Sequence, residues 1–399
     1  MTSQASVWVG QGPLVAIVFF GFLAVGIPIA ALSLEVHHGL GFSALVVGLV
    51  IGSQSAATVL VRHHAGTVAD QAGPRKAVLL GLPAAALSGV LYMASVALPL
   101  GPTVSLLVIV AGRLLMGVGE ALFITGSLAW GIARLGPSRT GVVMSWQGIA
   151  MFVALGVGGP IGLWAQARYG FAAVGALTVG APLVALAVAV LLPAAPGGGG
   201  VRVPFYKVLG LIWQPGVVLG LATAPFASIS AFVALDYHAQ GWTGGGWTGA
   251  GGAIAAFGAG YVAVRAVFSS LPDRLGGAPV AVVSLIVEAM GQVLLWLAPR
   301  PEIALAGACL TGAGFSLIFP AMGIEATRRV TAEQRGRAVG NFTAFFDLAI
   351  GLTGPVVGLA VAPLGFAGAF LIGGVCAVLG LALLFPMLRG PMRRDTRRA

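Results

Sequence analysis

The feature that most constrains this chain is the recurrence of long apolar segments, separated by short polar ones, along nearly its whole length. Of its 399 residues, 58% are hydrophobic and 8% are charged, whereas about a quarter of the residues of a soluble domain are charged. A helix that spans a membrane needs about 20 mainly apolar residues. The chain therefore has room for about twelve such helices and for little else.

Charged residues, prolines and glycines indicate where these segments end. They predict helices at 13–36, 42–62, 77–98, 103–133, 141–165, 171–192, 209–238, 247–268, 279–298, 303–327, 338–361 and 366–388. A proline- and glycine-rich run after the sixth helix is typical of a flexible linker. We therefore expect an all-α membrane protein with two six-helix bundles, 1–192 and 209–388, a cytoplasmic linker, 193–208, and a basic tail, 389–399.

The cations predict the orientation in the membrane, because cytoplasmic connections carry an excess of Lys and Arg. With both termini inside, the outer connections hold only Arg168 and Arg300, and Arg113 falls within a helix. The other cations lie inside: Arg62, Arg75, Lys76, Arg134, Arg139, Arg202, Lys207, Arg265, Arg274, Arg328, Arg329, Arg335, Arg337, Arg389, Arg393, Arg394, Arg397 and Arg398. The net charge of +10 is thus a topology signal with anionic lipids as its partner, and it gives no reason to expect nucleic acid.

The two predicted bundles also resemble each other in sequence, as in many secondary carriers. Arg62, Asp70 and Gly73 recur 203 residues later as Arg265, Asp273 and Gly276. Two further segments recur 195 residues later. The segment that begins at Ala111 parallels the one that begins at Ala306, and Gly159-Pro160 parallels Gly354-Pro355. Leu34 to His37 likewise parallels Leu235 to His238. Matches in the same order along both halves indicate a duplication.

The connection between the second and third helices carries Gly66, Asp70, Gly73 and the basic pair Arg75-Lys76. This spacing resembles the loop 2–3 motif of the major facilitator superfamily, and Asp273 belongs to a degenerate copy in the second half. The resemblance implies an inner gate. In that gate Asp70 holds the start of the eleventh helix and pairs with an arginine, for which Arg134 is the nearest candidate.

The fourth helix contains Arg113 and Glu120, seven residues and therefore two turns apart on one face, roughly 10 Å along the axis. Placing a charged side chain at the centre of a membrane-spanning helix costs roughly 2.5–3.5 kcal/mol on insertion scales. Such residues therefore face a cavity or a partner. Side chains lean toward the helix N-terminus, so the two share a cavity wall without pairing directly. The segment from Arg113 is similar to the superfamily's helix 4 motif. The alternative is that Arg113 and Glu120 form buried contacts that only hold helices together.

The fifth helix carries Gly156, Gly159 and Pro160, similar to the motif of superfamily antiporters, although Leu163 replaces an expected glycine. The resemblance covers essentially the whole chain and is closest to the drug and arabinose-efflux-permease-like branch. It implies a twelve-helix carrier working by alternating access. We expect proton-coupled export of a small organic solute, with proton-linked uptake of a sugar or organic acid as the alternative.

Other polar residues at membrane depth are candidates for parts of such a carrier. Besides Glu120 and Arg113, we expect Glu35 and Asp347 to take part in proton coupling, and Glu288 is a further candidate proton site. The outer ends of the first and seventh helices carry a polar cluster of Asp236, His37 and His238, with His38 nearby. The cluster is either an outer gate or a solvent-exposed helix end. Candidate cavity residues, for which packing is the simpler explanation, are Gln54, Trp130, Trp146, Gln147, Asn341 and Phe345.

Other classes of function lack their required residues. The helices contain no nucleophile–base set at membrane depth, and no phosphate-binding loop ending in Lys-Ser or Lys-Thr occurs, which disfavours an enzyme and an ATP-driven pump. We expect no cofactor and no metal site. The expected partners are a small-molecule substrate, protons and membrane lipids, for a monomer in a bacterial inner membrane.

Overall fold

The computed structural model describes residues 4–136, 139–195, 205–242, 247–330 and 335–389, with side chains described from residue 11 on except at 205–209, 335–341 and 389. Within these ranges twelve helices are long and apolar enough to cross a membrane. The elements are α1 (Gln4–Leu34), the π-helical turn η1 (Glu35–Gly39), α2 (Ala44–Gln71), α3 (Pro74–Ala97), α4 (Pro102–Leu135), α5 (Thr140–Tyr169), α6 (Phe171–Leu191), α7 (Phe205–Ala239), α8 (Ala250–Phe268), α9 (Leu271–Leu275), α10 (Gly277–Trp296), α11 (Pro301–Phe315), α12 (Ile318–Thr327), α13 (Arg335–Leu364) and α14 (Gly368–Arg389).

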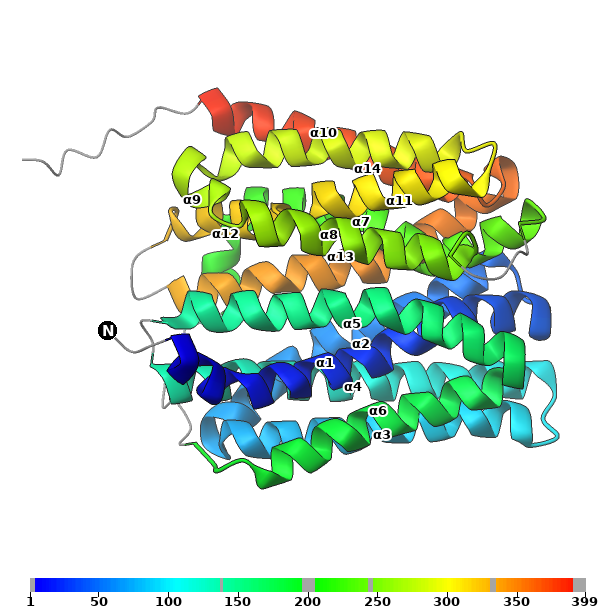
Figure 1. Cartoon of the computed structure of the whole chain (residues 1–399), viewed down its shortest axis with the longest axis horizontal. Helices are drawn as coiled ribbons and strands as arrows, with labels where there is room; N and C mark the ends of the chain where they lie inside the picture. The colour runs from blue at the N-terminus through cyan, green and yellow to red at the C-terminus, as the bar shows by residue number, and fades with distance from the viewer. Residues whose placement is uncertain (1–3, 137–138, 196–204, 243–246, 331–334, 390–399) are drawn as a thin grey trace, which may run out of the picture.

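The helices lie side by side in two groups, α1 to α6 and α7 to α14 (Figure 1). The beginning of α1 and the end of α14 lie at the same end of the bundle, on the left in Figure 1. We call this end the basic face, since the connections with most cations lie there, and the other end, with η1, the opposite face. The predicted all-α fold with twelve spanning helices is confirmed.

Several predicted boundaries were wrong. The second helix continues to Gln71, because Ala65 and Ala69 are buried and Gly66 does not end it, so Asp70 is helical. The turn comes only at Gly73, whose φ of 92° lies in the region that favours glycine. The seventh helix begins at Phe205, within the predicted linker, and residues 196–204 of that linker lie outside the described part.

The predicted tenth helix is interrupted rather than continuous, since α11 ends at Phe315 and α12 begins at Ile318. The carbonyl of Ser316 accepts a hydrogen bond from Arg265 Nη1 at 2.8 Å, and the Ser316 hydroxyl donates to the carbonyl of Tyr261 at 2.7 Å. Pro320 has no N–H to donate to the Ser316 carbonyl, so Arg265 of α8 provides a hydrogen bond that the helix cannot make for itself.

The two groups of helices contact each other through glycines toward the opposite face. On α2 and α13, a Cβ added to Gly48 would overlap the carbonyl of Gly354, and one added to Gly358 would lie 2.6 Å from the carbonyl of Ala44. On α5 and α8, a Cβ on Gly156 would lie 3.0 Å from the Cα of Gly258. Small residues thus let these helices approach backbone to backbone.

The buried apolar residues are consistent with this arrangement. One core cluster joins both groups toward the opposite face, and includes Leu32 of α1, Val47 of α2, Phe232 of α7 and Val357 of α13. The cluster toward the basic face, which includes Leu14 and Trp130, has members only from α1 to α6 among the described residues. The tightest contact between the groups is therefore at the opposite face.

Candidate functional site

A cavity lies between the two groups of helices. Its polar wall comes mainly from α2 and α4, and its apolar wall from α1, α5, α7 and α13. The lining residues are Phe22, Val25, Ile29, Ile51, Gln54, Ser55, Arg113, Glu120, Met151, Leu155, Phe226, Ala227, Ser230, Phe346, Asp347 and Ile350. We call it the central cavity.

The polar wall holds Glu120 through a neighbouring helix. Gln54 of α2 donates a hydrogen bond from Nε2 to Glu120 Oε2 at 2.6 Å. Arg113 is 2% exposed, and its Nη2 donates to the carbonyl of Ile51 at 3.0 Å. Arg113 and Glu120 therefore line the same cavity, and each forms a hydrogen bond with α2, Arg113 with Ile51 and Glu120 with Gln54. This arrangement agrees with the period of the helix.

A second polar contact joins the two halves of the molecule. Arg62 of α2 and Asp347 of α13 form an ion pair, in which the guanidinium Nη2 donates to the carboxylate. Asp347 also lines the central cavity, and the Arg62 side chain is 22% exposed. The cavity thus lies beside one ionic contact that exists only when α2 and α13 are together.

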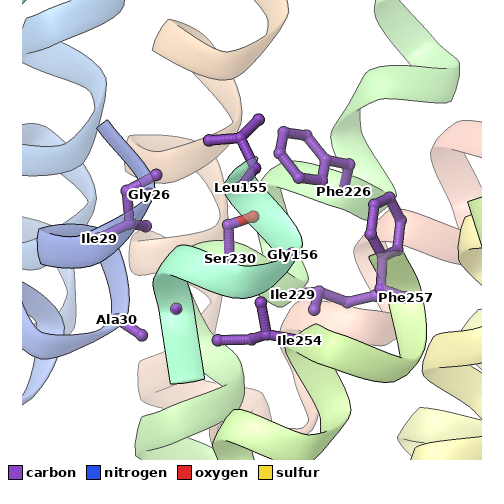
Figure 2. Close-up of a pocket in the computed structure, with 11 residues that line it drawn as sticks. Gly26, Ile29, Ala30, Leu155, Gly156, Phe226, Ile229, Ser230, Ile254 and Phe257 are labelled. Atoms are coloured by element: carbon purple, nitrogen blue, oxygen red, sulfur yellow. The ribbon is translucent and has the colours of Figure 1, made fainter. Parts of the chain in front are cut away.

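A smaller, mainly apolar pocket adjoins the central cavity on the side of the opposite face, and shares Ile29, Leu155, Phe226 and Ser230 with it. Figure 2 shows two helices of each half around it, with Gly26 from α1, Gly156 from α5 and Ile254 from α8. Ser230 of α7 contributes the one side-chain oxygen drawn there.

Aromatic rings cross the boundary between the halves close to these pockets. Phe152 of α5 stacks on Tyr261 of α8 with ring centroids 4.2 Å apart. It also contacts Phe226, Phe315 and Phe346 at centroid distances of 5.8, 5.6 and 6.3 Å. A ring of the first half is therefore enclosed by rings of the second, of which Phe226 and Phe346 also line the central cavity.

The predicted inner-gate residues lie at the basic face. Gly73 turns the chain between α2 and α3, and Arg75 Nη2 donates to the carbonyl of Val190 at 2.7 Å. The other members are exposed or partly exposed at this end: Gly66, Asp70, Lys76, Arg134 and Asp273. The pairing of Asp70 with Arg134 stays a prediction, and the side chains that begin α13 lie outside the described part.

The predicted outer-gate residues lie together at the opposite face. The rings of His38 and His238 face each other across the two halves with centroids 4.3 Å apart, and the His37 ring lies 4.8 Å from that of His38. The His37 ring also contacts the second half, at a centroid distance of 5.3 Å from Phe366, and its Nδ1 is 2.8 Å from the carbonyl of Phe42. Asp236 is buried nearby in sequence.

Several sequence candidates lie outside both pockets. Glu35 lies in η1 at the opposite face, beside Gln166, and does not line the central cavity with Glu120. Trp130 is buried in the first half and donates to the carbonyl of Pro193, while Gln147 donates to that of Ser127. Phe345 packs on Gly216 of α7, whereas its neighbour Phe346 lines the central cavity.

Two more candidates have less structural detail. Trp146 is partly buried on α5 and is not among the residues lining either pocket. The side chain of Asn341 lies outside the described residues. Gln54, by contrast, lines the central cavity and binds Glu120.

Gly156, Gly159 and Pro160, the antiporter-like segment, face the second half. A Cβ on Gly159 would lie 2.8 Å from Cδ1 of Ile254, and one on Gly251 would lie 3.1 Å from Cα of Pro160. The segment therefore forms part of the contact between α5 and α8.

Sequence reasoning missed several residues of the site. Arg62 was assigned to a cytoplasmic connection because the second helix was ended there, yet its recurrence as Arg265 was a signal that it does more than orient the chain. The apolar lining of Phe22, Met151 and Phe226 had no signal, because these residue types are common throughout spanning helices.

The sequence profile of the Major Facilitator Superfamily matches residues 14–250 and 217–399. The chain belongs to the Major Facilitator Superfamily. This member is 41% identical over 374 residues to an uncharacterised MFS-type transporter, STM4428, of Salmonella typhimurium, covering 94% of this chain and 95% of that one. It is 37% identical to the uncharacterised MFS-type transporter YhhS of Escherichia coli, over 95% and 93% of the two chains. It is therefore a membrane transporter.

Solved structures of superfamily members share the fold. A crystal structure of the nucleoside transporter NupG matches with a TM-score of 0.71 at 14% identity, covering 96% of this chain and 100% of that one. The human organic anion transporter MFSD10 matches with a TM-score of 0.67 at 15% identity, covering 94% and 99%. At this identity the superfamily member is similar to them in fold alone.

Proposed function

We propose that this transporter exports a small organic solute in exchange for protons. The observation that supports the proposal is the central cavity, in which Glu120 of the first half and Asp347 of the second face a space also lined by Phe22, Phe226 and Phe346. A carboxyl group in such a cavity can carry a proton when the solute is absent, and aromatic rings bind the solute's apolar part.

The proposed cycle uses the two halves as rocking units, as in other carriers with internal repeats. In the structure the halves are packed together at the opposite face by the contact of Gly48 with Gly354. In the proposed cycle this contact opens, while the motif around Asp70 holds the basic face closed. Protonation of Glu120 and binding of the solute exclude each other, which couples the two movements.

The proposed assignment to domains and sides follows from the same features. Residues 1–192 and 209–388 form the two units, 193–208 joins them, and 389–399 is a basic tail. The basic face lies in the cytoplasm of a bacterial cell, and the chain works as a monomer in the inner membrane. The outer gate consists of Asp236, His37 and His238, together with His38, whose ring faces that of His238.

The purified carrier in proteoliposomes tests the proposal directly. The vesicles contain a pH-sensitive dye, and a panel of small solutes is added outside, at the opposite face. We expect a transported solute to enter the vesicle while protons leave it for the side of the opposite face. Movement of protons and solute in the same direction would instead support uptake, the alternative that stays open because Leu163 replaces an expected glycine of the antiporter motif. A panel that includes organic cations, organic anions and sugars would at the same time give the solute class.

The orientation makes a separate prediction. In a variant lacking Cys309 and Cys376, we expect Gly101→Cys to react with an impermeant thiol reagent added to whole cells, because Gly101 is exposed at the opposite face. Lys76→Cys, exposed at the basic face, should react only after the cells are opened. The reverse labelling pattern would contradict the proposed orientation.

A further inference from the structure

A third carboxyl group is buried in the second half, outside both pockets. Glu288 of α10 is 0% exposed, and neither of its carboxyl oxygens has a hydrogen-bond partner among the described residues. It is absent from the residues that line the central cavity and the apolar pocket. The proposed export cycle gives it no role.

The surroundings of Glu288 are closely packed. A Cβ added to Gly314 of α11 would lie 2.5 Å from the Glu288 backbone nitrogen. One turn along α10, Gln292 is also 0% exposed; its Nε2 donates to Thr311 Oγ1 at 3.1 Å, while its Oε1 has no hydrogen-bond partner among the described residues. On α14, Gly373 lies against Gln292 Oε1. Three unpartnered oxygens thus lie on one face of α10.

Among the described residues, no Lys, Arg or His nitrogen donates a hydrogen bond to this carboxyl group. The ion pairs of Arg62 with Asp347 and of Arg328 with Glu325 do not include Glu288. An ionised carboxylate without a counter-charge in a protein interior costs several kcal/mol even after relaxation. A water molecule could donate hydrogen bonds to the oxygens, but it would not neutralise the charge.

The first half shows that the fold does not require an acid at this place. Gly119 and Gly314 are related by the repeat offset of 195. A Cβ on Gly119 would lie 2.8 Å from the backbone nitrogen of Ala85, the contact that corresponds to that of Gly314 with Glu288. The same packing is therefore made around an alanine, and the carboxyl group is an addition specific to the second half.

We propose that Glu288 binds a monovalent cation, a proton or Na⁺, in a site separate from the central cavity, with Gln292 Oε1 as a second oxygen ligand. A single carboxylate balances one positive charge, which excludes a divalent ion without a further acid. Carboxylate and amide oxygens are hard donors that suit such ions. The inference does not depend on proton-coupled export, since no residue of the site lines the central cavity.

Infrared spectra of the purified, full-length carrier test the proposal, with sodium chloride or choline chloride at equal ionic strength. If the cation is a proton, Glu288→Gln removes a protonated-carboxyl C=O band that the parent shows in both salts. If it is Na⁺, the variant removes a carboxylate band that shifts when sodium replaces choline. Glu325→Gln is the matched control, because Glu325 lies in the same half and is paired with Arg328; it should leave both signals in place.

A measurement on the unaltered protein covers the case in which Glu288→Gln does not fold. Dicyclohexylcarbodiimide modifies protonated carboxyl groups in apolar surroundings, so peptide mass spectrometry should find an adduct on Glu288, formed in both salts for a proton site and suppressed by sodium for a Na⁺ site. A Glu288 that gives no adduct, no protonated band and no sodium-dependent signal would overturn the proposal, because it would then be ionised without a cation.

Discussion

Replacing Glu120 by Gln is expected to abolish the accumulation of solute driven by a pH gradient. The amide has the shape of the protonated carboxyl group, and its oxygen can still accept the hydrogen bond that Gln54 Nε2 donates at 2.6 Å. The amide cannot bind or release a proton, so solute transport is no longer coupled to proton movement, while the central cavity keeps its shape. Binding or exchange of solute should survive and lose its pH dependence. Uptake into proteoliposomes with and without an imposed pH gradient measures the difference.

Two comparisons make this result specific to Glu120. Glu302→Gln changes an exposed carboxyl group at the start of α11 and should transport like the parent. The double variant Arg62→Gln with Asp347→Asn removes both members of an ion pair and leaves no uncompensated charge. It should therefore retain gradient-driven accumulation if Glu120 carries the proton. A Glu120→Gln protein that still concentrates solute, together with a double variant that does not, would transfer the coupling role to Asp347.

Replacing Gly48 by Leu is expected to hold the carrier open at the opposite face. A Cβ at this position overlaps the carbonyl of Gly354 in the closed arrangement, and backbone atoms cannot move aside as a flexible side chain would. Overpacking costs about 1–3 kcal/mol, which corresponds to a shift of roughly 5- to 150-fold between two states. We expect solute transport to fall by a factor in this range, while each half still folds.

The open state can be measured independently of transport. Ala30 is buried beside the apolar pocket, so an Ala30→Cys reporter, in a chain without its two native cysteines, should react faster with an impermeant thiol reagent when Gly48→Leu is present. Gly180→Leu is the control, because a Cβ at Gly180 meets nothing within 4 Å and the residue is exposed on α6. Equal reactivity of the reporter in all three backgrounds would contradict the role given to Gly48.

The sequence was sufficient for the parts of the structure that depend on short-range periodicity. Twelve apolar segments predicted the twelve helices, and a separation of seven residues placed Arg113 and Glu120 on one face of α4. The superfamily was identified from motifs whose spacing is local. These features follow from the length of a membrane span and the pitch of a helix.

What the sequence did not provide depends on contacts between distant segments. Arg62 and Asp347 are separated by 285 residues, and nothing local indicates that α2 and α13 bring them together. The interruption after Phe315 has a local signal in Pro320, which has no N–H to donate to the Ser316 carbonyl, but nothing local indicates that Arg265 of another helix binds this carbonyl instead. The choice between Phe345 and Phe346 for the cavity likewise depends on how α13 is rotated about its axis.

The interruption between α11 and α12 makes the two halves mechanically unequal. In the first half α4 is a single rod of 34 residues, so a tilt at one end is carried to the other. In the second half the corresponding span is two shorter helices that meet at Ser316, where Arg265 of α8 binds the backbone. We therefore expect a tilt of α12 at the basic face to be carried to α11 less completely than a tilt is carried along α4, so that the two halves differ in stiffness.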